Sequence, residues 1–322
     1  MYAKKKLKFA IIGCGSVAID HGIAIEKLGH QIVYGSTKNI HSSNWKFFKK
    51  NFPLTKFLST KEILKNKDID RIISCLPIDE QTKYCKKLLS SKKPILIEKP
   101  LHFNSKELEK IFIQKNIFLK NKAVAYNRRN YGVVSIIKKK IKKNKIKSVE
   151  INISENYSAL KKKYKKKTNK LFLHTGSSSH IIDLSFFLFG DLNIINKWVF
   201  KEKQLKSIFV LLSVKKNFPI FVKINSHDSE NASIKVRFFD NTLWSLSPIE
   251  ELNIYKGNKV IKSKNNYFKK MYEPVLKSCH KEEKKLRPGF LKQMKNFANL
   301  NFKELSNPKQ SLKLIRLFEK IL

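Results

Sequence analysis

The chain has 322 residues, a hydrophobic fraction of 42% and a formal net charge of +43. This length exceeds what one small core needs and suits two domains. No stretch approaches the roughly 20 consecutive apolar residues of a membrane span, and the apolar run after the basic N-terminus is too short for a secretory signal. We therefore expect a cytoplasmic protein that does not enter a membrane.

The positive charge comes mainly from lysine, because only six of the 68 basic residues are arginine and 62 are lysine. Proteins that read bases rely on arginine for bidentate contacts. A surplus of Lys, Asn, Ile and Phe is typical of AT-rich codon usage, so we favour solvated lysine surfaces over a nucleic-acid site. Residues 138–147 and 161–167 are the segments that nucleic acid would contact in that alternative.

The four cysteines, at positions 14, 75, 85 and 279, have no C-x-x-C spacing and no accompanying pattern of histidines. This spacing argues against a zinc site and against a framework of disulfides. We predict no metal.

The first element has the pattern of a dinucleotide-binding turn. An apolar strand at 9–12 is followed by Gly13, Gly15 and Ala18 at G-x-G-x-x-A spacing, with a helix expected over 16–28. The first glycine allows a sharp turn, the second lets a pyrophosphate approach the backbone, and the alanine lets the helix lie close to the strand. The helix N-terminus then faces the anion.

The second strand, at 30–35, lacks the acidic residue that holds a ribose 2′-hydroxyl in many dinucleotide folds. No Asp or Glu occurs from residue 30 to residue 52, and the strand continues into Ser36, Thr37 and Lys38. Two hydroxyls and a cation suit a 2′-phosphate, so among NAD(P) cofactors we slightly favour NADP(H). The alternative is that Lys38 is simply a solvated lysine.

Further strands alternate with helices up to residue 126. Ser59 and Glu62 form the pattern of a capping box that starts one of these helices. The remaining strands of this half are expected at 71–76, 94–98 and 122–126. This alternation predicts an α/β fold with a doubly wound parallel sheet and a ligand at the carboxyl ends of its strands.

After Tyr126 the pattern changes to strands in close succession. Helices are expected at 133–143, 178–189, 287–298 and 308–322, and strands at 147–155, 206–214, 218–225, 232–239 and 242–246. Asp240 and Asn241 suit a hairpin turn. We therefore predict two domains: residues 1–124 form a Rossmann domain, and residues 125–322 form an α+β domain with a mostly antiparallel open sheet.

The fourth expected core strand ends in Glu98, Lys99 and Pro100. A lysine at this position lies at the cofactor edge of the sheet, and the proline restricts its backbone. A partly desolvated ammonium group there can have a pKa low enough to exchange a proton with a hydroxyl.

The sequences GCGSVA at 13–18, EKP at 98–100 and AYNRR at 125–129, together with H-x-x-D at His180 and Asp183, resemble the glucose-fructose oxidoreductase and inositol dehydrogenase family, Gfo/Idh/MocA. The resemblance covers essentially the whole chain. It implies an N-terminal Rossmann domain, a C-terminal open sheet that often mediates oligomers, and NAD(P)-dependent oxidation or reduction of a sugar-like carbon.

By the same resemblance, Lys99 corresponds to the catalytic lysine, His180 to the histidine that acts with it on the substrate hydroxyl, and Asp183 to a supporting neighbour. From the residues alone, His180 could equally be a core histidine on an apolar helix. The residues expected to bind the cofactor are Gly13, Gly15, Ser16, Val17, Ser36, Thr37, Lys38, Leu76, Pro77, Glu98, Lys99 and Asn127.

Two positions depart from the family pattern. Many members carry Asp four residues before the histidine, where this chain has Gly176. Members also often have a histidine shortly after Pro77, where this chain has Glu80 and Gln81. The first departure puts the proton relay in doubt.

We interpret the chain as an NAD(P)-dependent dehydrogenase or reductase of a sugar or nucleotide-sugar. The segments at 176–191, 244–255 and 287–297 resemble the branch of the family found in surface-polysaccharide pathways. A homo-oligomer, dimer or tetramer, is expected. The alternative that Gly176 keeps open is a dinucleotide-binding sensor or scaffold without catalysis.

Overall fold

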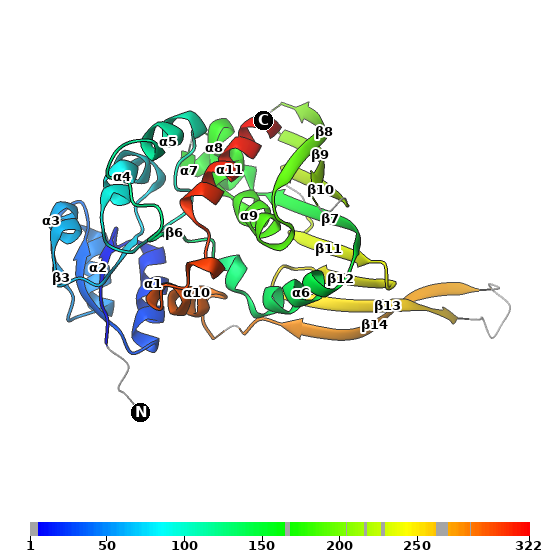
Figure 1. Cartoon of the computed structure of the whole chain (residues 1–322), viewed down its shortest axis with the longest axis horizontal. Helices are drawn as coiled ribbons and strands as arrows, with labels where there is room; N and C mark the ends of the chain where they lie inside the picture. Colours follow the sequence, from blue (N-terminus) through cyan, green and yellow to red (C-terminus); the bar gives the residue numbers. More distant parts are fainter. Residues whose placement is uncertain are drawn as a thin grey trace. The chain divides into compact units, whose positions relative to one another are not determined.

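The computed structural model describes residues 6–322 apart from residues 165–167, 204, 216–217, 227–228, 262–269 and 284. The chain divides into two compact units. Figure 1 shows the chain coloured from blue at the N-terminus to red at the C-terminus. The first unit contains residues 1–130 and 284–320, and the second contains residues 131–283. The chain passes from the first unit to the second after residue 130, and the boundary was expected at residue 124. The return of the C-terminal segment to the first unit was not expected.

A parallel sheet forms the centre of the first unit, as the alternating pattern predicted, and it has six strands where five were expected. Its strands consist of short apolar runs because helices cover both faces of such a sheet. In order across the sheet they are β3 (Lys56–Phe57), β2 (Gln31–Ser36), β1 (Lys8–Ile12), β4 (Arg71–Ser74), β5 (Ile95–Ile97) and β6 (Lys122–Val124).

Side-chain caps fix where several helices of this unit begin. Ser59 and Glu62 form the predicted capping box at the start of α3, and Asn307 with Gln310 forms another at α11. The helices and short 3₁₀ turns are α1 (Ser16–Lys27), α2 (Ser43–Asn51), α3 (Thr60–Lys65), α4 (Ile78–Ser90), α5 (Ser105–Phe112), η1 (Asn127–Asn130), α10 (Phe290–Ala298), η3 (Phe302–Glu304) and α11 (Pro308–Ile321).

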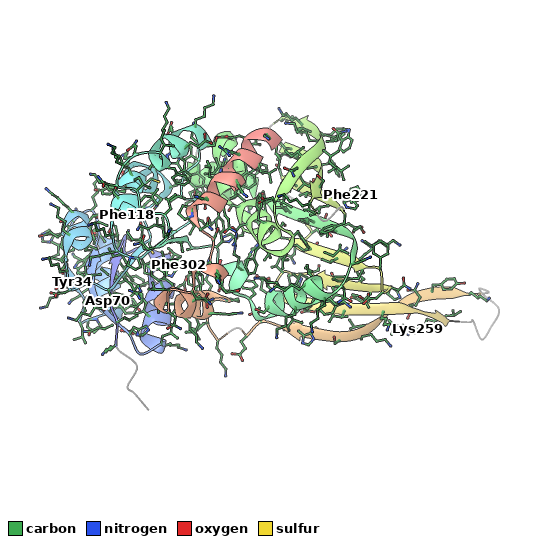
Figure 2. All side chains as sticks on the ribbon, viewed as in Figure 1. Tyr34, Asp70, Phe118, Phe221, Lys259 and Phe302 are labelled. Atoms are coloured by element: carbon green, nitrogen blue, oxygen red, sulfur yellow. The ribbon has the colours of Figure 1, made fainter. Side chains whose placement is uncertain are left out.

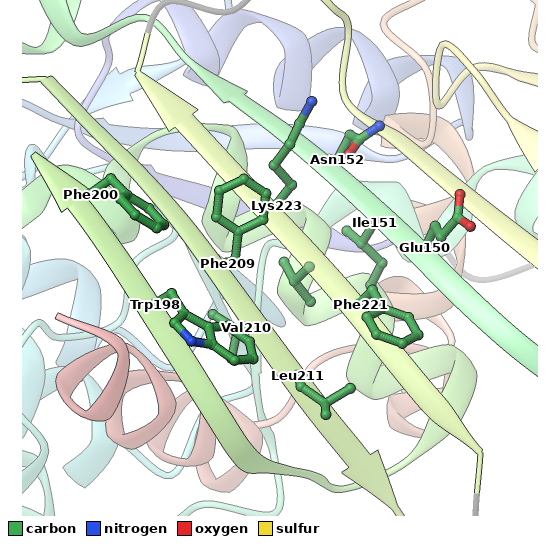
Figure 3. A pocket seen from close by; sticks show the side chains of 11 residues that line it. Glu150, Ile151, Asn152, Trp198, Phe200, Phe209, Val210, Leu211, Phe221 and Lys223 are labelled. Atoms are coloured by element: carbon green, nitrogen blue, oxygen red, sulfur yellow. The ribbon is translucent and has the colours of Figure 1, made fainter.

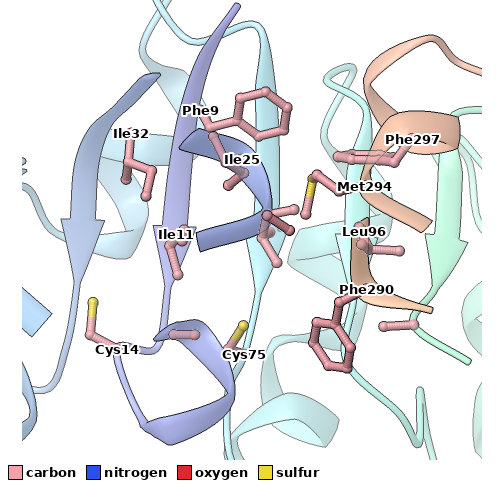
Figure 4. Packing of buried hydrophobic residues seen from close by; sticks show 14 of the residues in the cluster. Phe9, Ile11, Cys14, Ile25, Ile32, Cys75, Leu96, Phe290, Met294 and Phe297 are labelled. Atoms are coloured by element: carbon pink, nitrogen blue, oxygen red, sulfur yellow. The ribbon is translucent and has the colours of Figure 1, made fainter. Parts of the chain in front are cut away.

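The returning helix α10 completes the core of the first unit. Its apolar side chains pack with Phe9 of β1 and Ile25 of α1 (Figure 4), and Phe297 lies 6.4 Å from Phe9 between ring centroids. Met294 and Phe297 are fully buried. The Rossmann core therefore includes a segment that follows the whole second unit in the sequence.

An eight-stranded sheet forms the second unit and is antiparallel except where β7 pairs with β10. In order across the sheet its strands are β14 (Met271–Lys281), β13 (Glu251–Ile261), β12 (Thr242–Leu246), β11 (Ser233–Phe238), β7 (Ile146–Glu155), β10 (Pro219–Ser226), β9 (Leu205–Val214) and β8 (Leu192–Glu202). The Asp240–Asn241 turn joins β11 to β12 as predicted, with Asn241 at φ +60°.

The helices among the described residues of this unit are α6 (Gly132–Lys143), α7 (Tyr157–Tyr164), α8 (Thr168–Thr175) and α9 (Ser177–Phe189). Buried side chains alternate with more exposed ones along β7, and Val149, Ile151 and Ile153 lie on the buried face. Strand β8 was not predicted, and neither was the long hairpin of β13 and β14. In this hairpin, Lys259 of β13, which Figure 2 labels, pairs with Glu273 of β14 at 2.9 Å.

The fully buried Lys122 of β6 is expected to make the stability of the first unit depend on pH. Lys122 Nζ donates to the carbonyl oxygens of Ser91 (2.8 Å) and Lys93 (3.0 Å) and to the side chain of Asn121. Burial lowers the pKa of Lys122 from 10.5 to about 7. Between these pH values the unfolded chain binds more protons at this site than the folded chain, so the free energy of unfolding rises with pH.

We expect this rise to reach up to about 1.4 kcal/mol per pH unit. Urea unfolding measured from pH 7 to 10 checks it, with Lys122→Met as the variant that loses this contribution. Lys120→Met, at an exposed neighbouring lysine, serves as the control. Equal slopes in wild type and Lys122→Met would contradict the assignment.

Among the helices described, none combines the length and the apolar character required to cross a membrane.

Candidate functional site

The turn after β1 requires glycine at its first position. Gly13 has φ +89°, and its N–H donates to the Ser36 carbonyl at 2.7 Å. A Cβ at this residue would lie 2.7 Å from the carbonyl oxygen of Cys75 and 3.0 Å from the backbone nitrogen of Leu76. The turn therefore packs against the end of β4 so closely that a side chain does not fit.

Gly15 has the opposite surroundings. It is the N-cap of α1 with φ −80°, and a Cβ built on it would meet no atom within 4 Å. No side chain caps α1, and its first turn, which begins at Ser16 and Val17, carries no acidic residue. A helix N-terminus with open space beside it and no anionic side chain fits a pyrophosphate. The residues present therefore fit a dinucleotide.

The residues at the end of β2 make contacts within the protein. The Ser36 hydroxyl lies 3.0 Å from the Thr60 hydroxyl, and the Thr37 hydroxyl donates to the Asn39 carbonyl at 2.7 Å. Lys38 follows them in the chain. These contacts do not distinguish a 2′-hydroxyl from a 2′-phosphate, so the preference for NADP(H) stays a prediction.

A histidine that the sequence analysis did not select lies beside the Glu98-Lys99 motif. His21 of α1 is fully buried, and its Nε2 lies 2.8 Å from Glu98 Oε1. Its ring also lies 4.8 Å from that of Phe290, between centroids. The signal in the sequence was a polar residue on the buried side of α1, three positions after Ala18.

Glu98 also connects to the residue that follows it. The backbone N–H of Lys99 donates to Glu98 Oε2 at 3.2 Å, so one carboxylate accepts bonds from both His21 and the Lys99 backbone. The Lys99–Pro100 peptide bond is cis, and Lys99 is half-buried. The arrangement fixes the backbone of Lys99 at the carboxyl end of β5.

The other predicted cofactor residues lie in the same unit. Pro77 is the N-cap of α4, directly after Leu76. Asn127 is buried in η1, and its Nδ2 donates to the Pro288 carbonyl at 2.9 Å. Asn127 thus ties the end of the Rossmann strands to the segment that enters α10.

The thiols of Cys14 and Cys75, near the glycine turn, are not activated as nucleophiles. Burial raises the pKa of Cys14 to about 12 and that of Cys75 well above 9.0. Both side chains therefore remain protonated near neutral pH and behave as small apolar groups. Among the described residues, no three His, Cys, Asp or Glu side chains form a group that could hold a metal ion.

His180 and Asp183 lie in the second unit, on α9. They are three positions apart and therefore neighbours along one side of the helix. Asp183 is 2% exposed, whereas His180 is half-buried. Lys99 belongs to the first unit, so the pairing of its amine with the His180 imidazole stays a prediction.

The lysine-rich segments proposed as alternative nucleic-acid contacts are partly described. Residues 161–163 lie in α7, and residues 165–167 lie outside the described residues. Residues 138–143 form the last turns of α6.

Together, the glycine turn, the uncapped helix and the parallel sheet define a Rossmann fold whose first turn fits a dinucleotide. Residues 7–115 match the Gfo/Idh/MocA family, described as an oxidoreductase family with an NAD-binding Rossmann fold. This match agrees with the resemblance found in the sequence over the Rossmann part of the chain. No curated protein matches the sequence of the chain.

Solved structures of low sequence identity share the fold over nearly the whole chain. A dehydrogenase from Chromobacterium violaceum is 12% identical, with a TM-score of 0.78 over 99% of this chain and 95% of its own. Levoglucosan dehydrogenase in complex with NADH is 13% identical (TM-score 0.75; 98% and 96% covered). The 3-ketoreductase KijD10 from Actinomadura kijaniata, solved with TDP-benzene and NADP, is 13% identical (TM-score 0.68; 98% and 97% covered).

Proposed function

We propose that this protein is an NAD(P)-dependent oxidoreductase that transfers hydride between the nicotinamide and a carbinol or keto carbon of a sugar or nucleotide-sugar. The observation that carries the proposal is the turn at Gly13 and Gly15 in a chain whose residues 7–115 match an NAD-binding oxidoreductase family. Structural neighbours named for levoglucosan and for a TDP-linked ligand support the sugar and nucleotide-sugar classes.

In this proposal the backbone at Gly15, Ser16 and Val17 holds the pyrophosphate, and Asn127, Leu76 and Pro77 lie along the cofactor. A nicotinamide bound there would supply the hydride acceptor or donor for the reaction. Oxidation of a carbinol also releases the proton of its hydroxyl group, and Lys99 and His180 are the proposed acceptors of that proton. Glu98 holds the Lys99 backbone, and Asp183 supports His180. A cytoplasmic step of surface-polysaccharide synthesis is the setting that we propose.

The test starts with a titration of NAD(H) and NADP(H), followed by turnover assays with free and nucleotide-linked sugars and their keto forms. Hydride exchange with any of these substrates supports the proposal. Tight dinucleotide binding without exchange across the panel would favour the non-catalytic sensor instead. Absence of dinucleotide binding would overturn both.

We further propose that a second copy of the chain covers the outer face of the sheet in the second unit. Aromatic side chains gather on this face of β8, β9 and β10 and line a groove of about 480 Å³ (Figure 3). They are well exposed: Trp198 49%, Phe200 61%, Phe209 40% and Phe221 51%. A contiguous exposed apolar patch of this kind marks an interaction surface, and a self-complementary face is the usual basis of a two-fold dimer.

Phe221→Lys is expected to lower the molar mass measured by light scattering to that of a smaller assembly, because a charge then enters the apolar face of both copies. Phe239→Lys is the matched control, since Phe239 is 65% exposed but does not line this groove. A wild-type protein that is monomeric at micromolar concentration would contradict the proposal.

A further inference from the structure

A buried glutamate lies at the end of β7, next to the helix that carries His180 and Asp183. The inward positions of β7 are Val149, Ile151 and Ile153, and the period of two in a strand places Glu155 on the same face. Glu155 is only 2% exposed. An ionised carboxylate at such a position requires strong partners within the protein.

The partners of Glu155 include the first backbone amides of α9. Glu155 Oε2 accepts a hydrogen bond from the Ser177 N–H at 3.0 Å, and Oε1 accepts from both the backbone N–H and the hydroxyl of Ser178. Backbone amides at a helix N-terminus carry partial positive charge, so a carboxylate there is stabilised. Glu155 therefore caps α9 from a different element of the chain.

Gly176 provides the space for this carboxylate. Its backbone has φ −90° and ψ −152°, a conformation open to any residue. A Cβ on Gly176, however, would lie 1.8 Å from Glu155 Oε2. The carboxylate of Glu155 thus occupies the place where a side chain at position 176 would begin. Glycine is needed here because of its neighbour and not because of its own backbone.

We propose that Glu155 is a positioning residue for His180. In this proposal the Glu155 carboxylate, for which Gly176 leaves room, replaces an acidic side chain at position 176. The proposal rests on the function proposed above. His180 is the fourth residue of α9, within the turn that the carboxylate anchors. Glu155 fixes the start of this turn and supplies a negative charge that offsets the positive helix end beside the imidazole.

The test moves the carboxylate from one residue to the other. Four proteins are compared: wild type, Glu155→Ala, Gly176→Asp, and the double variant. Because Glu155→Ala removes the charge and Gly176→Asp alone collides with it, we expect each single variant to lose at least tenfold in kcat. The double variant, which carries the carboxylate on residue 176, is expected to regain most of that loss. KM and dinucleotide affinity are expected to change less than twofold.

Glu273→Ala is the control, because Glu273 lies on β14 of the same unit, outside the groove of β8, β9 and β10, and pairs with Lys259 at 2.9 Å. It should leave kcat unchanged. Glu155→Gln keeps the size of the side chain and provides a milder variant if Glu155→Ala does not fold.

The outcomes separate this inference from the proposed function. An active wild type with unchanged kcat in folded Glu155→Ala or Glu155→Gln overturns only the role of Glu155. A folded double variant that regains thermal stability but no activity also overturns it, because the carboxylate then acts solely as a helix cap. A wild type that exchanges no hydride with the substrate panel overturns the proposed function and this inference together.

Discussion

Replacing Lys99 by alanine is expected to lower kcat at least a hundredfold while the affinity for the dinucleotide remains within a few fold of wild type. A general acid or base at the reacting hydroxyl contributes about 10²–10⁴-fold to the rate. Lys99 lies two residues after the end of the core strand β5, and its backbone N–H donates to Glu98 Oε2 at 3.2 Å. Its removal therefore deletes the amine and leaves the glycine turn intact.

The measurement combines steady-state kinetics with a fluorescence titration of the reduced dinucleotide. Lys106→Ala is a suitable control, because Lys106 is an exposed lysine of α5 in the same unit. If Lys99→Ala lost only binding, the lysine would be a cofactor contact. If it kept full turnover, Lys99 would have no part in the proton transfer.

The bond between His21 and Glu98 makes a second variant informative at the same site. Glu98 accepts bonds from His21 and from the Lys99 backbone. A substitution at His21 would therefore act through the position of Lys99 and not through direct contact with substrate. The effect of Lys99→Ala should thus be the larger of the two.

The Rossmann sheet could be predicted because the sequence patterns that indicate it lie within short segments of the chain. Each of its main strands is a short apolar run, and the glycine spacing places the turn within one residue of where it lies. The second sheet was recognised in outline for the same reason. Strand β8 and the β13–β14 hairpin were missed because lysine and asparagine interrupt the alternation of apolar residues on which strand prediction depends.

The contacts that build the site could not be predicted in the same way, because they join residues far apart in the sequence. The amphipathic pattern of α10 predicts a buried face but does not say that this face packs on Phe9 and Ile25. Likewise, His21 and Glu98 are separated by 77 residues. In the sequence, Gly176 indicates only that an acidic residue is missing at this position. The structure shows that Glu155, at the end of β7, places its carboxylate beside Gly176. A single sequence carries periodicity but not these pairings.

Two glycines of one turn are expected to respond in opposite ways to the same substitution. Gly13→Ala should destabilise the first unit by at least about 2 kcal/mol, because a Cβ at φ +89° is strained and would lie 2.7 Å from the Cys75 carbonyl. Gly15→Ala should change the free energy of unfolding by less than about 1 kcal/mol, because its φ of −80° is open to alanine and no atom lies within 4 Å.

A measurement of dinucleotide affinity distinguishes Gly15→Ala from Gly13→Ala further. In Gly15→Ala the methyl group enters the open space beside the start of α1, where the pyrophosphate is proposed to approach the backbone, so we expect affinity to fall at least tenfold in a fully folded protein. Urea unfolding and dinucleotide titration on both variants provide the check. A Gly15→Ala protein that binds the dinucleotide as tightly as wild type would place the pyrophosphate elsewhere. A Gly13→Ala protein of unchanged stability would mean that the turn can relax away from β4.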